Sequence, residues 1–121
     1  MAEDKLVVRI AKLLDDKKAQ DVLALRVAHL TTLADYLVIA TGHNRIQTRA
    51  LCEHLDKHLS QGGLEPRRVE GRSDGTWIVM DYADVIVHIF IPDARQYYRL
   101  ERLWDDGQNR VDLPFLEPVS H

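Results

Sequence analysis

The chain has 121 residues, of which 45% are hydrophobic and 29% charged, so it predicts one compact domain and excludes wholesale disorder. Its longest apolar run, 85–91, contains His88 and is far shorter than the ~20 residues that span a membrane, and the acidic N-terminus lacks a secretory-signal pattern. The single Cys52 excludes an intramolecular disulfide, so we expect a soluble cytoplasmic protein. The chain has 16 basic and 19 acidic residues, and one of the basic and four of the acidic residues follow Trp104. The rest of the chain is therefore formally neutral, which argues against binding driven by nucleic-acid phosphates.

The first half of the chain predicts a helix, two strands and a second helix. Apolar residues recur at helical spacing over 3–19, and they alternate over 21–28 in the pattern of a half-buried strand. Residues 36–40 are continuously apolar, as expected of a strand covered on both faces. Asn44 is a suitable N-cap for a helix that ends before Gly62. The predicted core face of this helix comprises Ile46, Ala50, Leu51, Leu55 and Leu59.

Three strands are predicted next. The first, a weak strand over 64–70, contains Pro66, which is typical of a sheet edge. After a turn at 73–75, two strong strands over 76–82 and 84–91 follow each other almost without a loop. We therefore expect the two strong strands to pair antiparallel.

A third helix, opened by Pro92, is predicted to run to about residue 105. The expected fold class is α/β: a single layered domain, 1–106, with a mixed sheet of about five strands and helices packed on it, in the order αββαβββα. Residues 107–121 show no clear period and predict an acidic, flexible C-terminal tail, which Phe115 and Leu116 attach to the body.

Two histidines on the second helix have the spacing of a helical zinc pair. His54 and His58 are four residues apart, but the position after the first histidine, where metalloproteases carry a general-base Glu, is Leu55. No third ligand is evident nearby. Two surface histidines on a charged helix face are therefore the favoured interpretation, and no metal or other cofactor is predicted.

Two carboxylates flank the corner between the two strong strands. Asp81 and Asp84 suit Mg²⁺ binding for nucleotidyl transfer, provided that a backbone loop cradles the phosphates. Only the loop at 41–43 offers such a cradle, and it has neither a second Gly nor a following Lys. Turn-forming and interface carboxylates are the favoured interpretation, so catalysis is not predicted.

Aromatic residues and arginines indicate a binding surface. The strand 76–82 carries Trp77 on one face and Tyr82 on the other, so we expect at least one face to be only partly covered. Exposed aromatics beside arginine are typical of interface hot spots, and a core Trp beside a solvated arginine face is the equally weighted alternative. Base stacking is a third interpretation, weakened by the neutral body.

The third helix is predicted to carry two different faces. Tyr97, Leu100 and Trp104 form one stripe that we expect to face the core, and Tyr98 lies off that stripe. A further face, predicted to be basic and exposed, comprises Arg95, Arg99 and Arg102.

Five segments in one order resemble the ribosomal silencing factor (Iojap) family. They are 16–19 (DKKA), 35–42 (DYLVIATG), 69–71 (VEG), 77–88 (WIVMDYADVIVH) and 98–104 (YRLERLW). The resemblance spans about residues 15–104 without gaps. The sequence departs from the family pattern at Arg26, Ile46 and Ala83.

The resemblance implies a non-enzymatic translation repressor with nucleotidyltransferase-like topology. Such proteins bind the large ribosomal subunit through its ribosomal protein number fourteen, and they sterically block joining of the small subunit, particularly under nutrient limitation. We expect Trp77 and Tyr98 to anchor this contact, and Asp81 and Glu101 to pair with basic residues of the partner. The expected contacts with the ribosomal protein are Trp77, Asp81, Tyr82, Asp84, Tyr98, Glu101 and Trp104, and the expected contacts with adjacent rRNA are Arg95 and Arg102.

Two alternatives from other functional classes stay open. One is a metal-dependent nucleotidyltransferase-like enzyme built on Asp81 and Asp84. The other is a homodimeric scaffold without catalysis, because an uncovered aromatic strand face also suits self-association in the free state.

Overall fold

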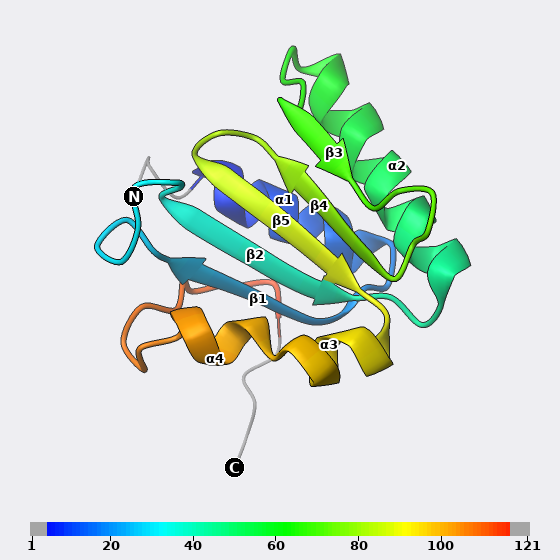
Figure 1. Cartoon of the computed structure of the whole chain (residues 1–121). Helices are drawn as coiled ribbons and strands as arrows, with labels where there is room; N and C mark the ends of the chain where they lie inside the picture. The colour runs from blue at the N-terminus through cyan, green and yellow to red at the C-terminus, as the bar shows by residue number, and fades with distance from the viewer. Residues whose placement is uncertain (1–4, 117–121) are drawn as a thin grey trace.

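The computed structural model describes residues 5–116 as one five-stranded sheet with helices on both faces (Figure 1). In chain order the elements are α1 (Lys5–Asp16), β1 (Gln20–Arg26), β2 (Tyr36–Thr41), α2 (Arg45–Gln61), β3 (Arg68–Glu70), β4 (Trp77–Asp81), β5 (Val85–Phe90), α3 (Pro92–Tyr98) and α4 (Leu100–Trp104). The predicted α/β class is confirmed, and so is the predicted order, apart from the division of the last helix. None of these helices is long and apolar enough to cross a membrane.

The strands lie in the order β1-β2-β5-β4-β3. β2 and β5 pair in parallel, whereas the other neighbours pair antiparallel, so the sheet is mixed, as predicted. The antiparallel pair of β4 and β5 is confirmed, with Ala83 at φ 71° in the corner between them. β3 has only three residues, at the sheet edge as predicted. Pro66 precedes β3, where its missing N–H costs no ladder hydrogen bond.

Each face of the sheet carries a hydrophobic cluster. α1 and α2 cover one face, and α3 and α4 lie on the other, along β1 and β2 (Figure 1). All six residues of β2 are buried, which confirms the prediction that both of its faces are covered. β1 is half-buried over most of its length, as predicted, but near its end both faces are covered: Ala24 belongs to the cluster under α1 and Leu25 to the cluster under α4.

The second helix begins and ends as predicted. The side chain of Asn44 accepts a hydrogen bond from the Gln47 N–H at 2.9 Å, and Gly62 follows the last turn. The predicted core face is only partly right, because Ile46 is 74% exposed and Ala50 is also exposed. The buried residues are Thr48, Leu51, Cys52, Leu55 and Leu59, which form one stripe at intervals of three and four residues.

The predicted third helix is divided into two short helices at Arg99. This residue has left-handed backbone angles, φ 48° and ψ 49°, and its N–H donates to the Arg95 carbonyl. The break turns α4 relative to α3, so the predicted core stripe does not form: Leu100 packs against the sheet, whereas Tyr97 is 80% exposed. The continuous arginine face does not form either, because the Arg95 side chain is only 13% exposed.

The segment after α4 packs against β1. The Arg26 N–H donates to the Asn109 carbonyl at 2.7 Å, and the Val111 N–H donates to the Ala24 carbonyl at 2.9 Å, so this segment extends the sheet beyond β1. Its buried and half-buried apolar residues are Val111, Leu113, Phe115 and Leu116. The prediction of a flexible tail is therefore wrong for 107–116, although Phe115 and Leu116 attach it as predicted. The rest of that prediction, 117–121, lies outside the described residues.

Candidate functional site

The sheet face that carries α3 and α4 is only partly covered by them. The two helices follow β1 and β2, and within residues 5–116 no helix lies over the same face of β4 and β3 (Figure 1). At the border between the covered and uncovered parts lie four aromatic side chains that successive ring contacts connect: His88, Trp77, Tyr98 and Tyr97. We call these four residues the aromatic surface.

Trp77 is the centre of the aromatic surface. Its ring lies 4.6 Å from the Tyr98 ring and stacks on Phe90 at 5.0 Å, measured between ring centroids. Its Nε1–H donates to His88 Nδ1 at 3.0 Å. Because Phe90 is fully buried and paired with Trp77 across β4 and β5, the sheet itself sets the position of the indole. Trp77 is therefore half-buried and held in one orientation by a polar and an apolar contact.

His88 is neutral in this environment. Burial lowers its pKa from 6.5 to about 4. The hydrogen bond from Trp77 also requires an unprotonated Nδ1, so the neutral ring carries its proton on Nε2.

Acid is expected to destabilise the protein through His88. The unfolded chain binds a proton near pH 6.5 and the folded chain only near pH 4, so the contribution of His88 is complete above pH 6.5 and is lost progressively below it. Between pH 7 and pH 5 the wild type should lose roughly 1–2 kcal/mol more unfolding free energy than His88→Gln. Urea unfolding of both proteins at the two pH values measures this difference, and parallel losses would contradict it.

The tyrosines of α3 extend the aromatic surface into solvent. Tyr98 is 49% exposed and Tyr97 80%, and their rings meet edge to face at 5.0 Å. Leu103, on α4, is 73% exposed. Large, rigid aromatic side chains in this half-buried state are the residue type that dominates binding energy at protein interfaces.

Asp81 is engaged within the chain. It is 7% exposed, and its carboxylate accepts hydrogen bonds from the Ala83 N–H at 2.8 Å and from Arg67 Nη2 at 3.2 Å. Arg68 Nη2 lies 3.8 Å from the same carboxylate. Burial opposes ionisation, but the Ala83 N–H and the Arg67 guanidinium outweigh it, so the pKa of Asp81 lies below its usual value. The carboxylate is thus already paired with two arginines of the same chain, whereas we expected it from the sequence to pair with basic residues of a partner.

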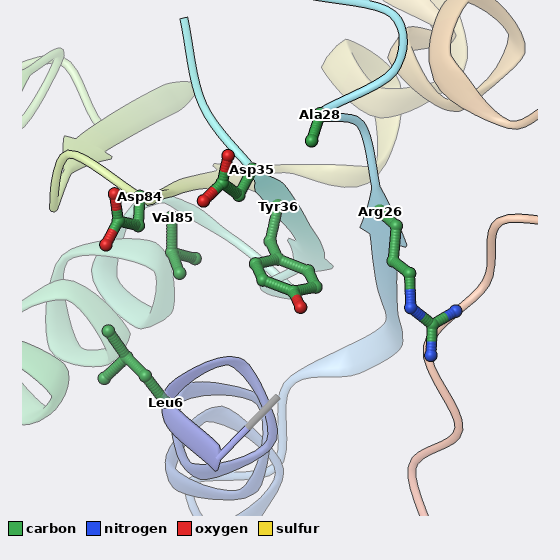
Figure 2. A pocket seen from close by; sticks show the side chains of 7 residues that line it. All are labelled: Leu6, Arg26, Ala28, Asp35, Tyr36, Asp84 and Val85. Atoms are coloured by element: carbon green, nitrogen blue, oxygen red, sulfur yellow. The ribbon is translucent and has the colours of Figure 1, made fainter. Parts of the chain in front are cut away.

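Tyr82 and Asp84 lie apart from the aromatic surface. Tyr82 is 4% exposed and packs in the cluster under α1 and α2, where burial raises its pKa. Asp84 is exposed and lines a pocket of about 420 Å³ where β2 and β5 begin. Figure 2 shows the pocket, whose lining residues are Leu6, Arg26, Ala28, Asp35, Tyr36, Asp84 and Val85.

The arrangement does not assemble the carboxylate pair considered for Mg²⁺. Asp84 lines the pocket of Figure 2, whereas Asp81 lies under Arg67. Within residues 5–116, no group of three or more His, Cys, Asp or Glu side chains is placed to hold a metal ion. His54 and His58 are neighbours, with ring centroids 4.4 Å apart.

The remaining predicted contacts belong to α3 and α4. Trp104 is half-buried against the cluster on this sheet face, and Arg102 is exposed. Glu101 accepts a hydrogen bond from Arg95 Nε at 3.3 Å. Arg95 also donates to Thr41 Oγ1, so its guanidinium is engaged within the chain.

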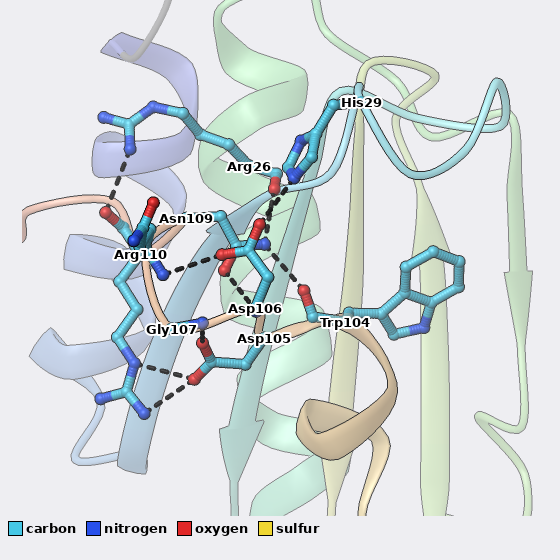
Figure 3. A network of polar contacts seen from close by, with 9 residues as sticks. Arg26, His29, Trp104, Asp105, Asp106, Gly107, Asn109 and Arg110 are labelled. Carbon is cyan, nitrogen blue, oxygen red and sulfur yellow. Dashed lines mark hydrogen bonds and ion pairs between the residues drawn. The ribbon is translucent and has the colours of Figure 1, made fainter.

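A polar network behind Trp104 was not predicted from the sequence. Asn109 is 4% exposed, and its side-chain N–H groups donate to the carbonyls of Trp104 at 2.7 Å and Arg26 at 2.8 Å (Figure 3). Its side-chain oxygen accepts from the Asp106 N–H at 2.9 Å, and Asp106 pairs with His29 at 2.8 Å. From the sequence alone, the run 105–109 predicts only a turn. The role of Asn109 could not be predicted, because one of its acceptors, the Arg26 carbonyl, lies 83 residues away.

Known proteins resemble this chain over most of its length. The sequence pattern of the family "Ribosomal silencing factor during starvation" matches residues 1–121. Ribosomal silencing factor RsfS of Halalkalibacterium halodurans is 37% identical over 107 residues, 88% of this chain and 92% of that protein. A crystal structure of a Chromobacterium violaceum protein has a TM-score of 0.79 at 30% identity, and the match covers 92% of this chain and 95% of that one.

A more distant relative extends the comparison beyond bacteria. The Mus musculus protein named "Mitochondrial assembly of ribosomal large subunit protein 1" is 28% identical over 98 residues, which are 78% of this chain and 43% of that protein. The family pattern covers the whole chain, and the bacterial relative exceeds 30% identity over nearly all of its own length. The chain therefore belongs to the ribosomal silencing factor family.

Proposed function

We propose that this protein represses translation by binding the large ribosomal subunit through its ribosomal protein number fourteen, which sterically blocks joining of the small subunit under nutrient limitation. The observation that carries the proposal is the aromatic surface, in which two tyrosines and a half-buried tryptophan stand at the edge of an uncovered sheet face. Such a surface suits a protein partner, because aromatic side chains supply much contact area at low entropy cost. Membership of the silencing factor family and the name of the mouse relative support the ribosome as its location.

Within this proposal the residues divide into two groups. Trp77 and Tyr98 contact the partner directly, with Trp104 beside them on the same sheet face. Asp81 and Glu101 act through their pairs with arginines of the same chain. Arg102 remains a candidate rRNA contact, because its side chain is exposed.

Co-sedimentation with separated ribosomal subunits tests the docking step. We expect the purified protein to sediment with large subunits and not with small ones, and Tyr98→Ala to lose this association. Ile46→Ala is the control, because Ile46 is an exposed apolar residue on α2, on the other face of the sheet. Folded protein that sediments with neither subunit would contradict the proposal.

Subunit joining tests the consequence of docking. Adding the protein to large subunits before small subunits should lower the yield of joined ribosomes, whereas Tyr98→Ala should leave the yield unchanged. Normal joining in the presence of bound wild-type protein would refute steric blocking while leaving docking intact.

We further propose that the protein acts in the cytoplasm by binding, without catalysis. Mg²⁺ and nucleoside triphosphates are then expected not to raise its melting temperature, since only a ligand of the native state stabilises it. A rise in melting temperature that Asp81→Asn abolishes would support the enzyme instead.

Sedimentation velocity over a range of concentrations tests whether the free protein forms a homodimer through the aromatic surface. If it does, Tyr98→Ala should remain monomeric.

A further inference from the structure

One guanidinium, on a side chain that is only 13% exposed, joins four elements of the fold. Arg95 lies on α3, and its Nη1 donates to the Asp21 carbonyl of β1 at 2.6 Å and to Thr41 Oγ1 of β2 at 2.9 Å. Its Nε donates to Glu101 Oε1 of α4 at 3.3 Å. The planar, forked guanidinium is the side chain best suited to several acceptors in fixed directions.

The acceptor on β1 comes from an irregularity in that strand. The register of the β1–β2 pair shifts between Gln20 and Leu23, and Asp21 has φ 50°, a conformation that costs a residue other than glycine some strain. A bulge of this kind leaves a backbone group outside the ladder. The freed Asp21 carbonyl is the one that Arg95 binds.

The helices that Arg95 joins are short and only partly buried. α3 has seven residues and α4 five, and no residue of either helix is fully buried. Isolated helices of this length do not persist in water, so tertiary contacts must decide their orientation. The apolar contacts are partial, from Ala94, Leu100 and Trp104 against the sheet cluster. Between the helices, Arg99 is left-handed, a second position at which the backbone is held away from its ordinary conformation.

We propose that Arg95 is the positioning residue of the aromatic surface: by joining β1, β2 and α4 to α3, it sets the angle at Arg99 and thereby holds Tyr98 over Trp77. The inference rests on the proposed function, in which Tyr98 and Trp77 contact the ribosome. It also replaces the rRNA contact expected of Arg95, because the guanidinium is satisfied inside the protein.

Binding of large ribosomal subunits is the first test. Arg95→Met keeps much of the apolar stem and removes all three hydrogen bonds, and we expect it to weaken binding about tenfold or more. Arg95→Lys keeps the charge but not the fork, and should fall between Arg95→Met and the wild type. The matched control is Gln96→Met, an isosteric change at the neighbouring exposed residue, which should bind normally. Normal binding by both Arg95 variants would overturn the inference.

Trp77 fluorescence separates positioning from general stability. The chain has two tryptophans, so Trp77 is the sole reporter in a Trp104→Phe background. In that background we expect Arg95→Met to shift the emission of the folded protein to the red, toward the value of Tyr98→Ala, in which the ring over the indole is gone. If Arg95→Met does not fold, Arg95→Lys is measured instead. Unchanged emission in a folded variant would refute positioning.

The same data distinguish the two proposals. If the folded wild-type protein does not sediment with large subunits, the proposed docking function fails, whereas the emission shift still tests Arg95. If Tyr98→Ala loses binding but both Arg95 variants keep it and their emission is unchanged, only the inference about Arg95 fails.

Discussion

Tyr98→Ala is expected to weaken binding to the large ribosomal subunit by at least ~30-fold, or about 2 kcal/mol, while leaving the protein folded. The side chain is 49% exposed, and its main contact within the protein is the Trp77 ring at 4.6 Å. Truncation therefore removes interface area without opening a cavity in the core. A titration of large subunits by co-sedimentation measures the affinity, and thermal unfolding checks the fold.

Three further variants sharpen this prediction. Tyr98→Phe keeps the ring and should retain most of the affinity. Trp77→Ala should lose at least as much as Tyr98→Ala, but it also removes the hydrogen bond to His88 and the stack on Phe90. Trp77→Phe preserves an aromatic ring at that position and so separates contact with the partner from damage to the site. A folded Tyr98→Ala variant with wild-type affinity would show that Tyr98 is not an anchor.

Asn109→Ala is expected to lower the unfolding free energy by about 2–4 kcal/mol. The change leaves the carbonyls of Trp104 and Arg26 without their side-chain donor, and the Asp106 N–H without its acceptor. Because Asn109 is 4% exposed, water cannot readily replace these hydrogen bonds. Urea unfolding measures the loss.

A neighbouring residue provides the control for Asn109. Gln108 is exposed, and its side chain forms no hydrogen bond or ion pair within residues 5–116. Gln108→Ala should therefore change the unfolding free energy by less than about 0.5 kcal/mol. Asn109→Asp has nearly the same shape but offers carboxylate oxygens to two carbonyls at neutral pH. We therefore expect Asn109→Asp to lower the unfolding free energy at pH 7, although its side chain has nearly the same shape as that of Asn. An Asn109→Ala protein as stable as Gln108→Ala would mean that this network contributes nothing to stability.

Local sequence patterns were sufficient for the sheet and for the two long helices. The continuous apolar run of β2 predicted a strand covered on both faces, and Asn44 marked the start of α2 through a hydrogen bond to the third residue beyond it. The strands β4 and β5 are separated by one tight corner, so their pairing needed no long-range information. Each of these features depends on residues close together in the chain.

The candidate site was only partly predictable for the same reason. The importance of Trp77 and Tyr98 followed from residue type, resemblance and strand alternation, but the exposure of Tyr97 did not, because a regular helix would have placed it inside. Asp81 and Arg95 looked like free charges. Asp81 pairs with Arg67, which lies just before β3, and Arg95 binds the Asp21 carbonyl, 74 residues away.

The sequence by itself determined the fold class, the order of the strands and helices along the chain, the family and the aromatic composition of the surface. Only the tertiary structure decided where the last helix breaks, that 107–116 extends the sheet, and which charges are already paired. The physical reason is that a residue such as Asn109 is buried by partners that lie far away in the sequence, and that no local pattern requires the left-handed conformation of Arg99. The periodicity of apolar residues predicts which face of a helix or strand is buried. The helix break and the charge pairs depend instead on how the elements pack against one another.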